Sequence, residues 1–292
     1  MIKVLATDLD GTLFYPKRKI SLISGKNKKF LRKFVKEGKK VILVTGRNQN
    51  VSSKVAKKIG SKLNLIGCNG GIIIENGQII KENCISHDIA KKIYYSNKDD
   101  KKILIWMIFT SDGKMYLQQK NCNLIYRLFA AIGISTQFAY REKYTIGEKK
   151  LEAMLDDENS HIIKIMPCYG IRKRCRVVAQ KATEEFIKEY GDISEAVWSN
   201  TAVEIMAKGT NKASSLKLFT DDMGVNDDEI AVVGDSGNDI SLFKEYYNNS
   251  FVMSNAPDAI KKEAKYEVNS VSDIEKFINE KEKNLWTKLQ DL

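Results

Sequence analysis

Two aspartates that stand two residues apart, Asp8 and Asp10, lie close to the start of the chain in the stretch VLATDLDGTLF. Apolar alternation over residues 2–6 predicts a short strand, so both acids lie at its carboxyl end and face the same side. Two carboxylates about 4 Å apart repel each other by about 4 kcal/mol at an effective dielectric of about 20. A bound cation, or a proton on one acid, would relieve this repulsion. The bland alternative is a plain Asp-Gly turn at Asp10 and Gly11.

Polar residues follow two further apolar runs in the same way. Thr45 follows the run 41–44, and Asp235 follows the run 230–234. In an open parallel sheet, the crevice that binds ligands lies outside the carboxyl ends of the strands. We therefore expect Asp8, Asp10, Thr45 and Asp235 to converge, although turns often carry such residues singly.

The elements that must position these residues are near-continuous apolar strands that alternate with amphipathic helices. This pattern is typical of an α/β fold with a parallel sheet covered on both faces. Between about 83 and 192 the strand candidates are longer and partly alternating, which indicates an inserted mixed α/β unit with a sheet of its own.

Composition excludes several classes of protein. The 292 residues are 43% hydrophobic and 29% charged, as in soluble globular proteins, and no apolar run approaches the length of a membrane span. Because the first predicted strand begins directly after residue 3, we expect no signal peptide. Five cysteines without C-x-x-C spacing suggest neither a disulfide framework nor a zinc site, so we expect a cytoplasmic protein. The two histidines, His87 and His161, are expected to be surface or cap residues.

The net charge of +11 raises the possibility of nucleic-acid binding, as does the basic run Arg172–Arg176. However, the lysines of the N-terminal part fall on the outer faces of two predicted amphipathic helices, so solvated helix faces explain them better. The predicted apolar stripes of these helices are Phe30, Leu31, Phe34 and Val35 in the first, and Val51, Val55 and Ile59 in the second.

Four segments together carry a family resemblance. DLDGTL at 8–13, Thr45, KGTNKASSLKLF at 208–219 and GDSGNDISLF at 234–243 resemble the four motifs of haloacid-dehalogenase-superfamily phosphatases. Their order, and SNAP at 254–257, resemble the Cof-type members, which carry a large α/β cap between the second and third motifs. The resemblance covers all but about the last ten residues. It implies a Rossmann-like catalytic core at 1–82 and 193–292, with the cap at 83–192 as the part that selects the substrate.

The resemblance also implies a role for each motif residue. Asp8 would be the nucleophile that forms an aspartyl-phosphate, and Asp10 the general acid and base. Mg²⁺ would be bound by Asp8, by the backbone carbonyl of Asp10 and by Asp235, with Asp239 either as a ligand or as a partner of the ligands. The residues expected to hold the phosphoryl group are Gly11, Thr45, Gly46, Lys212 and Asn238.

Several assignments stay open at this stage. Lys208 is a rival to Lys212, although the Lys-Gly-x-x-Lys spacing favours Lys212. Arg47 is expected to form a local salt bridge and receives no catalytic role. Asn69–Gly71 is either a plain turn or a loop close to the substrate. Two aromatic residues of the insert, Trp106 and Tyr116, are expected to belong to its core or sheet surface rather than to stack on a substrate.

The sequence thus predicts a Mg²⁺-dependent phosphatase of small phosphorylated metabolites such as sugar phosphates. No membrane partner is expected, nucleic acid is an improbable partner, and the oligomeric state is open between monomer and dimer. One alternative is a phosphotransferase or phosphomutase acting on sugar phosphates, which would need a second acceptor site. The other is a non-catalytic regulator that binds a phosphometabolite or nucleic acid.

Overall fold

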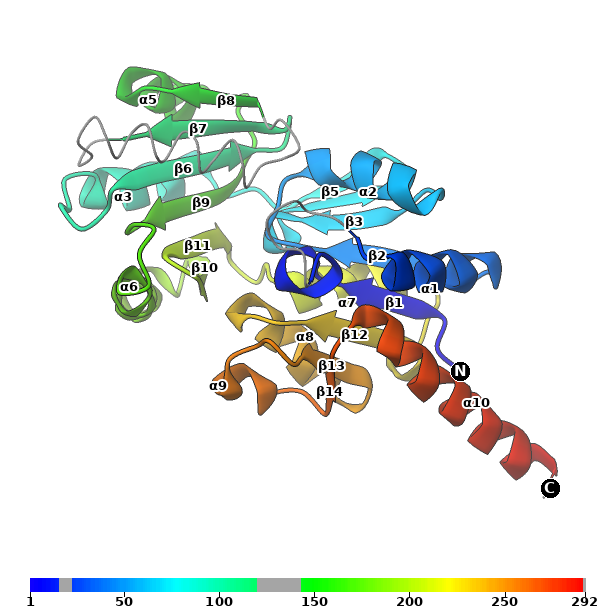
Figure 1. Ribbon diagram of the computed structural model, residues 1–292. Helices are drawn as coiled ribbons and strands as arrows, with labels where there is room; N and C mark the ends of the chain where they lie inside the picture. The colour runs from blue at the N-terminus through cyan, green and yellow to red at the C-terminus, as the bar shows by residue number, and fades with distance from the viewer. Residues whose placement is uncertain (16–22, 120–142, 291–292) are drawn as a thin grey trace.

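The computed structural model describes residues 1–15, 23–119 and 143–290, and it contains two sheets (Figure 1). The larger sheet has eight strands in the order β14-β13-β12-β1-β2-β3-β4-β5. Its strands pair in parallel from β14 to β3, and β4 and β5 are added antiparallel at one edge. The strands are β1 (Val4–Thr7), β2 (Lys40–Val44), β3 (Asn64–Gly67), β4 (Ile72–Glu75), β5 (Gln78–Glu82), β12 (Ile230–Gly234), β13 (Ser250–Met253) and β14 (Tyr266–Val268).

Helices cover both faces of this sheet because its apolar strand residues point alternately to either side. Leu5 packs in one buried cluster with helices α1, α2 and α10, whereas Val4 and Ala6 pack in another with α7, α8 and α9. The predicted stripes of α1 and α2 do face this core, with Val35 partly buried. The helices are α1 (Gly25–Lys36), α2 (Ser52–Ile59), α7 (Lys212–Asp221), α8 (Ile240–Glu245), α9 (Asp258–Lys261) and α10 (Ile274–Gln290). The predicted α/β class with a parallel sheet is confirmed.

The second sheet has six strands in the order β10-β11-β9-β6-β7-β8 and is antiparallel except between β7 and β8. Its strands are β6 (Ile105–Thr110), β7 (Lys114–Gln118), β8 (Lys143–Ile146), β9 (Ile162–Cys168), β10 (Ser194–Ser199) and β11 (Ala202–Ala207). Its helices are α3 (His87–Asn97), α5 (Glu148–Asp156) and α6 (Cys175–Tyr190), which pack on one face around Trp106. Trp106 is therefore a core residue, as expected.

The expected end of the insert at residue 192 is too early for this sheet. Strands β10 and β11 form a hairpin, and β11 pairs with β9 in the middle of the second sheet. The chain returns to the larger sheet only after Ala207, since the next element, α7, packs on that sheet. The hairpin turns at Asn200, whose φ of 53° suits a tight turn.

Two short connections join the parts that contain the sheets. One runs from the end of β5 at Glu82 to the start of α3 at His87, and the other from the end of β11 at Ala207 to the start of α7 at Lys212. Apolar residues on the other face of the second sheet, among them Met107 and Ile163, belong to the same buried cluster as Leu5 of the core. The two parts therefore share apolar contacts.

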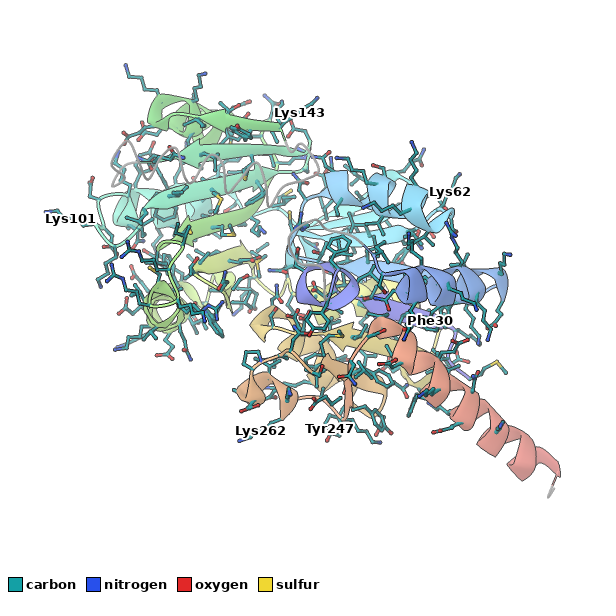
Figure 2. The ribbon with its side chains drawn as sticks, in the orientation of Figure 1. Phe30, Lys62, Lys101, Lys143, Tyr247 and Lys262 are labelled. Carbon is teal, nitrogen blue, oxygen red and sulfur yellow. The ribbon has the colours of Figure 1, made fainter. Side chains whose placement is uncertain are left out.

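Basic residues lie mainly on the surface of both parts. Lys101 and Lys143 of the insert, and Lys62 and Lys262 of the core, are exposed and project from the ribbon (Figure 2). Of the helices within the described ranges, none combines the length and the apolar character that crossing a membrane requires.

Candidate active site

Asp8 and Lys212 meet where β1 ends and α7 begins. The amide of Asp8 donates to the carbonyl of Val233 at 2.9 Å, which extends the pairing of β1 with β12 by one residue. Lys212 is the first residue of α7, and the side chain of Asn211 caps that helix. The fully buried Lys212 Nζ lies 2.9 Å from Asp8 Oδ1 and 2.6 Å from Asp239 Oδ1. Lys208, its rival, has a side chain that is 55% exposed and pairs with Glu195, so Lys212 is the lysine of this motif that contacts Asp8 and Asp239.

Asp235 and Asp239 lie on the loop that follows β12. Asp239 Oδ2 accepts hydrogen bonds from the amides of Asp235 and Ser236, each at 3.0 Å, and Oδ1 accepts from Lys212. Asp235 Oδ1 accepts from Thr12 Oγ1 at 3.1 Å, which links this loop to the one that follows β1. Both carboxylate oxygens of Asp239 thus accept hydrogen bonds from the protein. This residue therefore fixes the positions of the loop after β12 and of the Lys212 ammonium.

Three carboxylates crowd this cluster. Carboxylate oxygens of Asp8, Asp235 and Asp239 lie within 4.8 Å of one another, and Lys212 contacts both Asp8 and Asp239. Burial raises the pKa of Asp8 well above its ordinary value, Lys212 opposes this, and the charges of Asp239, Asp235 and Asp10 add to it. Burial alone would lower the pKa of Lys212, but Asp239 and Asp8 together raise it above its usual range. A bound cation beside Asp8 would stabilise its ionised form.

Gly11 makes the close approach of the two acidic loops possible. Its φ of 82° lies in the left-handed region, and a Cβ at this position would lie 2.0 Å from Asp235 Oδ2. Any larger residue would push the carboxylate of Asp235 away from Asp8.

Asp10 points away from the buried cluster. Its side chain is 54% exposed, and its carboxylate accepts two hydrogen bonds from Arg47, at 2.5 Å from Nε and 2.6 Å from Nη2. The local salt bridge expected for Arg47 is therefore present, and its partner is the predicted acid and base.

The remaining predicted phosphate-binding residues lie on loops beside this cluster. Thr45 is buried at the end of β2, the strand next to β1, and its Oγ1 accepts from the amide of Arg47 at 3.2 Å. The amide of Asn69 donates to the carbonyl of Thr45 at 3.0 Å, and Asn238 Nδ2 donates to Asn69 Oδ1 at 3.2 Å. The 69–71 segment thus joins the site through Asn69. This favours its interpretation as a loop close to the substrate over that as a plain turn.

Two buried charged side chains of the second sheet contact the loops that follow β2 and β3. Lys164 on β9 donates to the carbonyl of Gly46 at 2.5 Å and lies 3.2 Å from Glu204 on β11. Glu204 accepts from Asn69 Nδ2 at 2.5 Å. The insert therefore contacts the loops after β2 and β3 through polar groups in addition to apolar packing.

Sequence reasoning missed four contributors to this site. Two lie within motifs, and two lie on strands of the second sheet whose contact with the site no local pattern indicates. Asn255, in the SNAP segment, is the clearest case, since its Nδ2 lies 3.3 Å from the carbonyl oxygen of Gly11 and 3.4 Å from Asp235 Oδ2. The four are Thr12, Lys164, Glu204 and Asn255.

The chain belongs to the haloacid dehalogenase-like hydrolases, whose family pattern matches residues 5–278. It is 26% identical to a phosphoglycolate phosphatase of Methanobrevibacter smithii over 268 residues, 91% of each chain. It is 23% identical to a 5-amino-6-(5-phospho-D-ribitylamino)uracil phosphatase of Bacillus subtilis, over 91% of this chain and 89% of that one. A haloacid dehalogenase-like hydrolase from Bacteroides thetaiotaomicron shares the fold, with a TM-score of 0.72, 19% identity and coverage of 95% and 100%.

The predicted resemblance to Cof-type phosphatases is therefore confirmed. The protein is an enzyme of the phosphoric monoester hydrolase class, within a family of phosphatases and phosphotransferases.

Proposed function

We propose that this protein is a Mg²⁺-dependent phosphatase that hydrolyses small phosphorylated metabolites through an aspartyl-phosphate on Asp8. The observation that carries the proposal is the buried group formed by Asp8, Lys212, Asp239 and Asp235, in which oxygens of the three carboxylates lie within 4.8 Å of one another at the ends of adjacent parallel strands. An all-oxygen donor set of this kind suits a hard cation. Bound Mg²⁺ would neutralise charge on the phosphoryl oxygens and on Asp8.

The residues of this group divide into those that would bind the metal and those that would hold the ligands in position. We assign the carboxylates of Asp8 and Asp235 and the backbone carbonyl of Asp10 to the metal. Asp239 has both oxygens on N–H donors, so we assign it a positioning role instead of direct coordination. Lys212 holds one oxygen of Asp8 in place for attack on phosphorus.

Asp10 must change partners during the reaction. It would protonate the leaving oxygen and then accept a proton from the water that attacks the aspartyl-phosphate. In the structure Arg47 occupies both of its oxygens, so Asp10 has to leave this ion pair before it can donate a proton. We assign Gly11, Thr45, Gly46, Lys212 and Asn238 to the phosphoryl group.

The relatives and the insert both support small phosphorylated metabolites as the substrate class. The named relatives act on phosphoglycolate and on a phosphoribityl compound, and a structural neighbour is a sugar phosphatase. The insert lies against the site through Lys164 and Glu204, which leaves little space for a folded macromolecule. We propose that the insert selects among such metabolites, and the expected cytoplasmic location stays a prediction.

The test compares Asp8→Asn with Asp10→Asn on an activated aryl phosphate. Chelation should abolish wild-type hydrolysis and Mg²⁺ should restore it. Asp8→Asn should give no turnover and no phosphoenzyme. Asp10→Asn should lose about 10²- to 10⁴-fold in turnover and accumulate a phosphoenzyme labile to hydroxylamine, because an activated leaving group needs little protonation whereas the attacking water still needs a base.

Full activity in chelator would contradict the role of the metal. Equal amounts of phosphoenzyme in both variants, or wild-type turnover by Asp8→Asn, would show that the roles of the two aspartates are wrongly assigned.

A further inference from the structure

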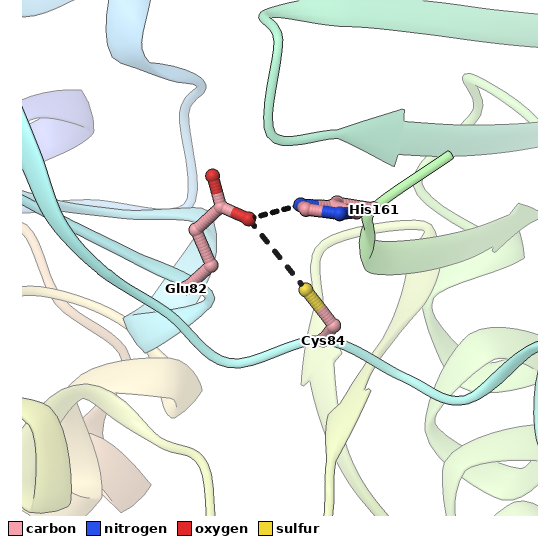
Figure 3. A group of neighbouring side chains, drawn as sticks. All are labelled: Glu82, Cys84 and His161. Carbon is pink, nitrogen blue, oxygen red and sulfur yellow. Dashed lines mark hydrogen bonds and ion pairs between the residues drawn. The ribbon is translucent and has the colours of Figure 1, made fainter. Parts of the chain in front are cut away.

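A second group of metal-ligating side chains lies far from the motifs in sequence, at the first connection between the two sheets. Glu82 ends β5 of the core sheet, Cys84 lies on the connection itself, and His161 immediately precedes β9 of the insert. Their side chains point toward one another (Figure 3), with Glu82 Oε2 2.5 Å from His161 Nδ1 and 3.9 Å from Cys84 Sγ. One donor atom from each lies within 4.8 Å of the other two.

The backbone already holds these three residues in place. The amide of Ile85 donates to the carbonyl of Ile162 at 2.7 Å, which keeps the neighbouring residues Cys84 and His161 side by side. On the core side, the amide and side chain of Asn83 donate to the carbonyls of Gly71 and Gly70, at 2.9 and 2.7 Å. The donor atoms are thus brought together by fixed segments of chain from both parts of the molecule.

We propose that Glu82, Cys84 and His161 form a binding site for a Zn²⁺-class transition metal. One sulfur, one nitrogen and one carboxylate oxygen are ligands that Zn²⁺ takes in proteins, and a water would complete a tetrahedron. Softer thiolate and imidazole ligands disfavour Mg²⁺, so this site differs in chemistry from the all-oxygen cluster around Asp8.

The present distances are close to those a metal requires. Tetrahedral Zn²⁺ places neighbouring ligand atoms about 3.3–3.6 Å apart, given bonds of about 2.0–2.3 Å. The two separations from Glu82 Oε2, 2.5 Å to His161 and 3.9 Å to Cys84, each need to change by less than about 1 Å. His161 has a side chain that is 58% exposed, so its ring has room for such a shift.

Metal binding would release the thiol proton to solvent as the metal–sulfur bond forms. Because Glu82 belongs to the core sheet and His161 to the insert, a bound ion would tie the two parts together.

The test is titration of the metal-free full chain with Co²⁺, which reports thiolate ligation as a near-ultraviolet charge-transfer band. The oxygen ligands around Asp8 cannot produce this band. We expect it in the wild type and in Asp8→Asn, and we expect it to be absent in Cys84→Ser and lost or weakened in His161→Gln. Cys175→Ser is the matched control, since it removes another partly exposed thiol and should retain the band.

Affinity for Zn²⁺, measured by competition with a chromogenic chelator, gives the second readout. Loss of a direct ligand should exceed the roughly 10- to 100-fold that loss of an outer hydrogen-bonding partner costs. A wild type without the band, or a band that persists in Cys84→Ser, would overturn the proposal and leave a hydrogen-bonded ion pair only.

Discussion

Replacing Lys212 by Met tests the electrostatic balance of the active site in the folded protein itself. The ammonium is fully buried and contacts Asp8 and Asp239, while Asp235 adds a third carboxylate nearby. Met fills a similar volume without charge, so in the absence of metal Lys212→Met leaves Asp8 and Asp239 without the ammonium that contacts both. Removing one partner of a buried ion pair typically costs about 3–5 kcal/mol.

Lys208→Met is the matched control, four residues earlier in the same motif. Lys208 is largely exposed and lies 3.8 Å from Glu195, and an ion pair of this kind contributes about 0–1 kcal/mol. Urea unfolding in the presence of a chelator should therefore separate the two variants by about 2–5 kcal/mol. Adding Asp8→Asn to Lys212→Met should recover part of the loss, because it removes one of the repelling charges.

Equal destabilisation by Lys212→Met and Lys208→Met would refute this reasoning, since it would mean that the carboxylates need no cation. The double variant gives an independent check. If Asp8→Asn destabilises Lys212→Met further, the two residues are not coupled through charge. The expected coupling lies in the range of about 0.5–3 kcal/mol seen for residues in direct contact.

Three further perturbations address other parts of the site. Gly11→Ala places a methyl group 2.0 Å from Asp235 Oδ2, so Mg²⁺ binding measured by calorimetry should weaken strongly, whereas Gly38→Ala, at a left-handed position with open space around it, should leave binding unchanged. The raised pKa of Asp8 means that the folded state holds a proton that the unfolded state releases above the ordinary value of 3.8, so the free energy of unfolding of the metal-free protein should fall as pH rises through this window. Asp8→Asn should flatten that pH dependence, and an unchanged slope would contradict the burial argument. Lys164→Met leaves Glu204 buried without its cation, so it should destabilise the protein and raise KM, while Lys143→Met, at an exposed site of the insert, should do neither.

Strand ends could be read from the sequence because continuous apolar runs fix where buried strands stop. This is why Asp8 and Asp235, each after such a run, were expected at one edge of the sheet and are found within the same cluster. Lys212 was distinguishable from Lys208 only by motif spacing, and the structure supplies the physical difference, which is complete burial against exposure.

Contacts that depend on the packing of the insert could not be predicted. Glu204 and Asn69 are separated by 135 positions in the chain, and no local pattern links them. The hairpin of β10 and β11 shows the same limit, since alternation of apolar and polar residues identifies strands but does not tell which sheet they join. Its residues were therefore assigned to the core, whereas they pair with β9.

The two connections between the sheets constrain how the insert can move. Residues 83–86 and 208–211 are the whole length of chain between β5 and α3 and between β11 and α7. Four residues span at most roughly 13–14 Å even when fully extended, so the insert cannot drift away from the core as a tethered domain would. Two such short connections form a hinge, and they leave rotation of the insert about the line that joins them as its easiest motion. One of these connections ends at Lys212, so such a rotation of the insert would begin beside the residue whose ammonium contacts Asp8.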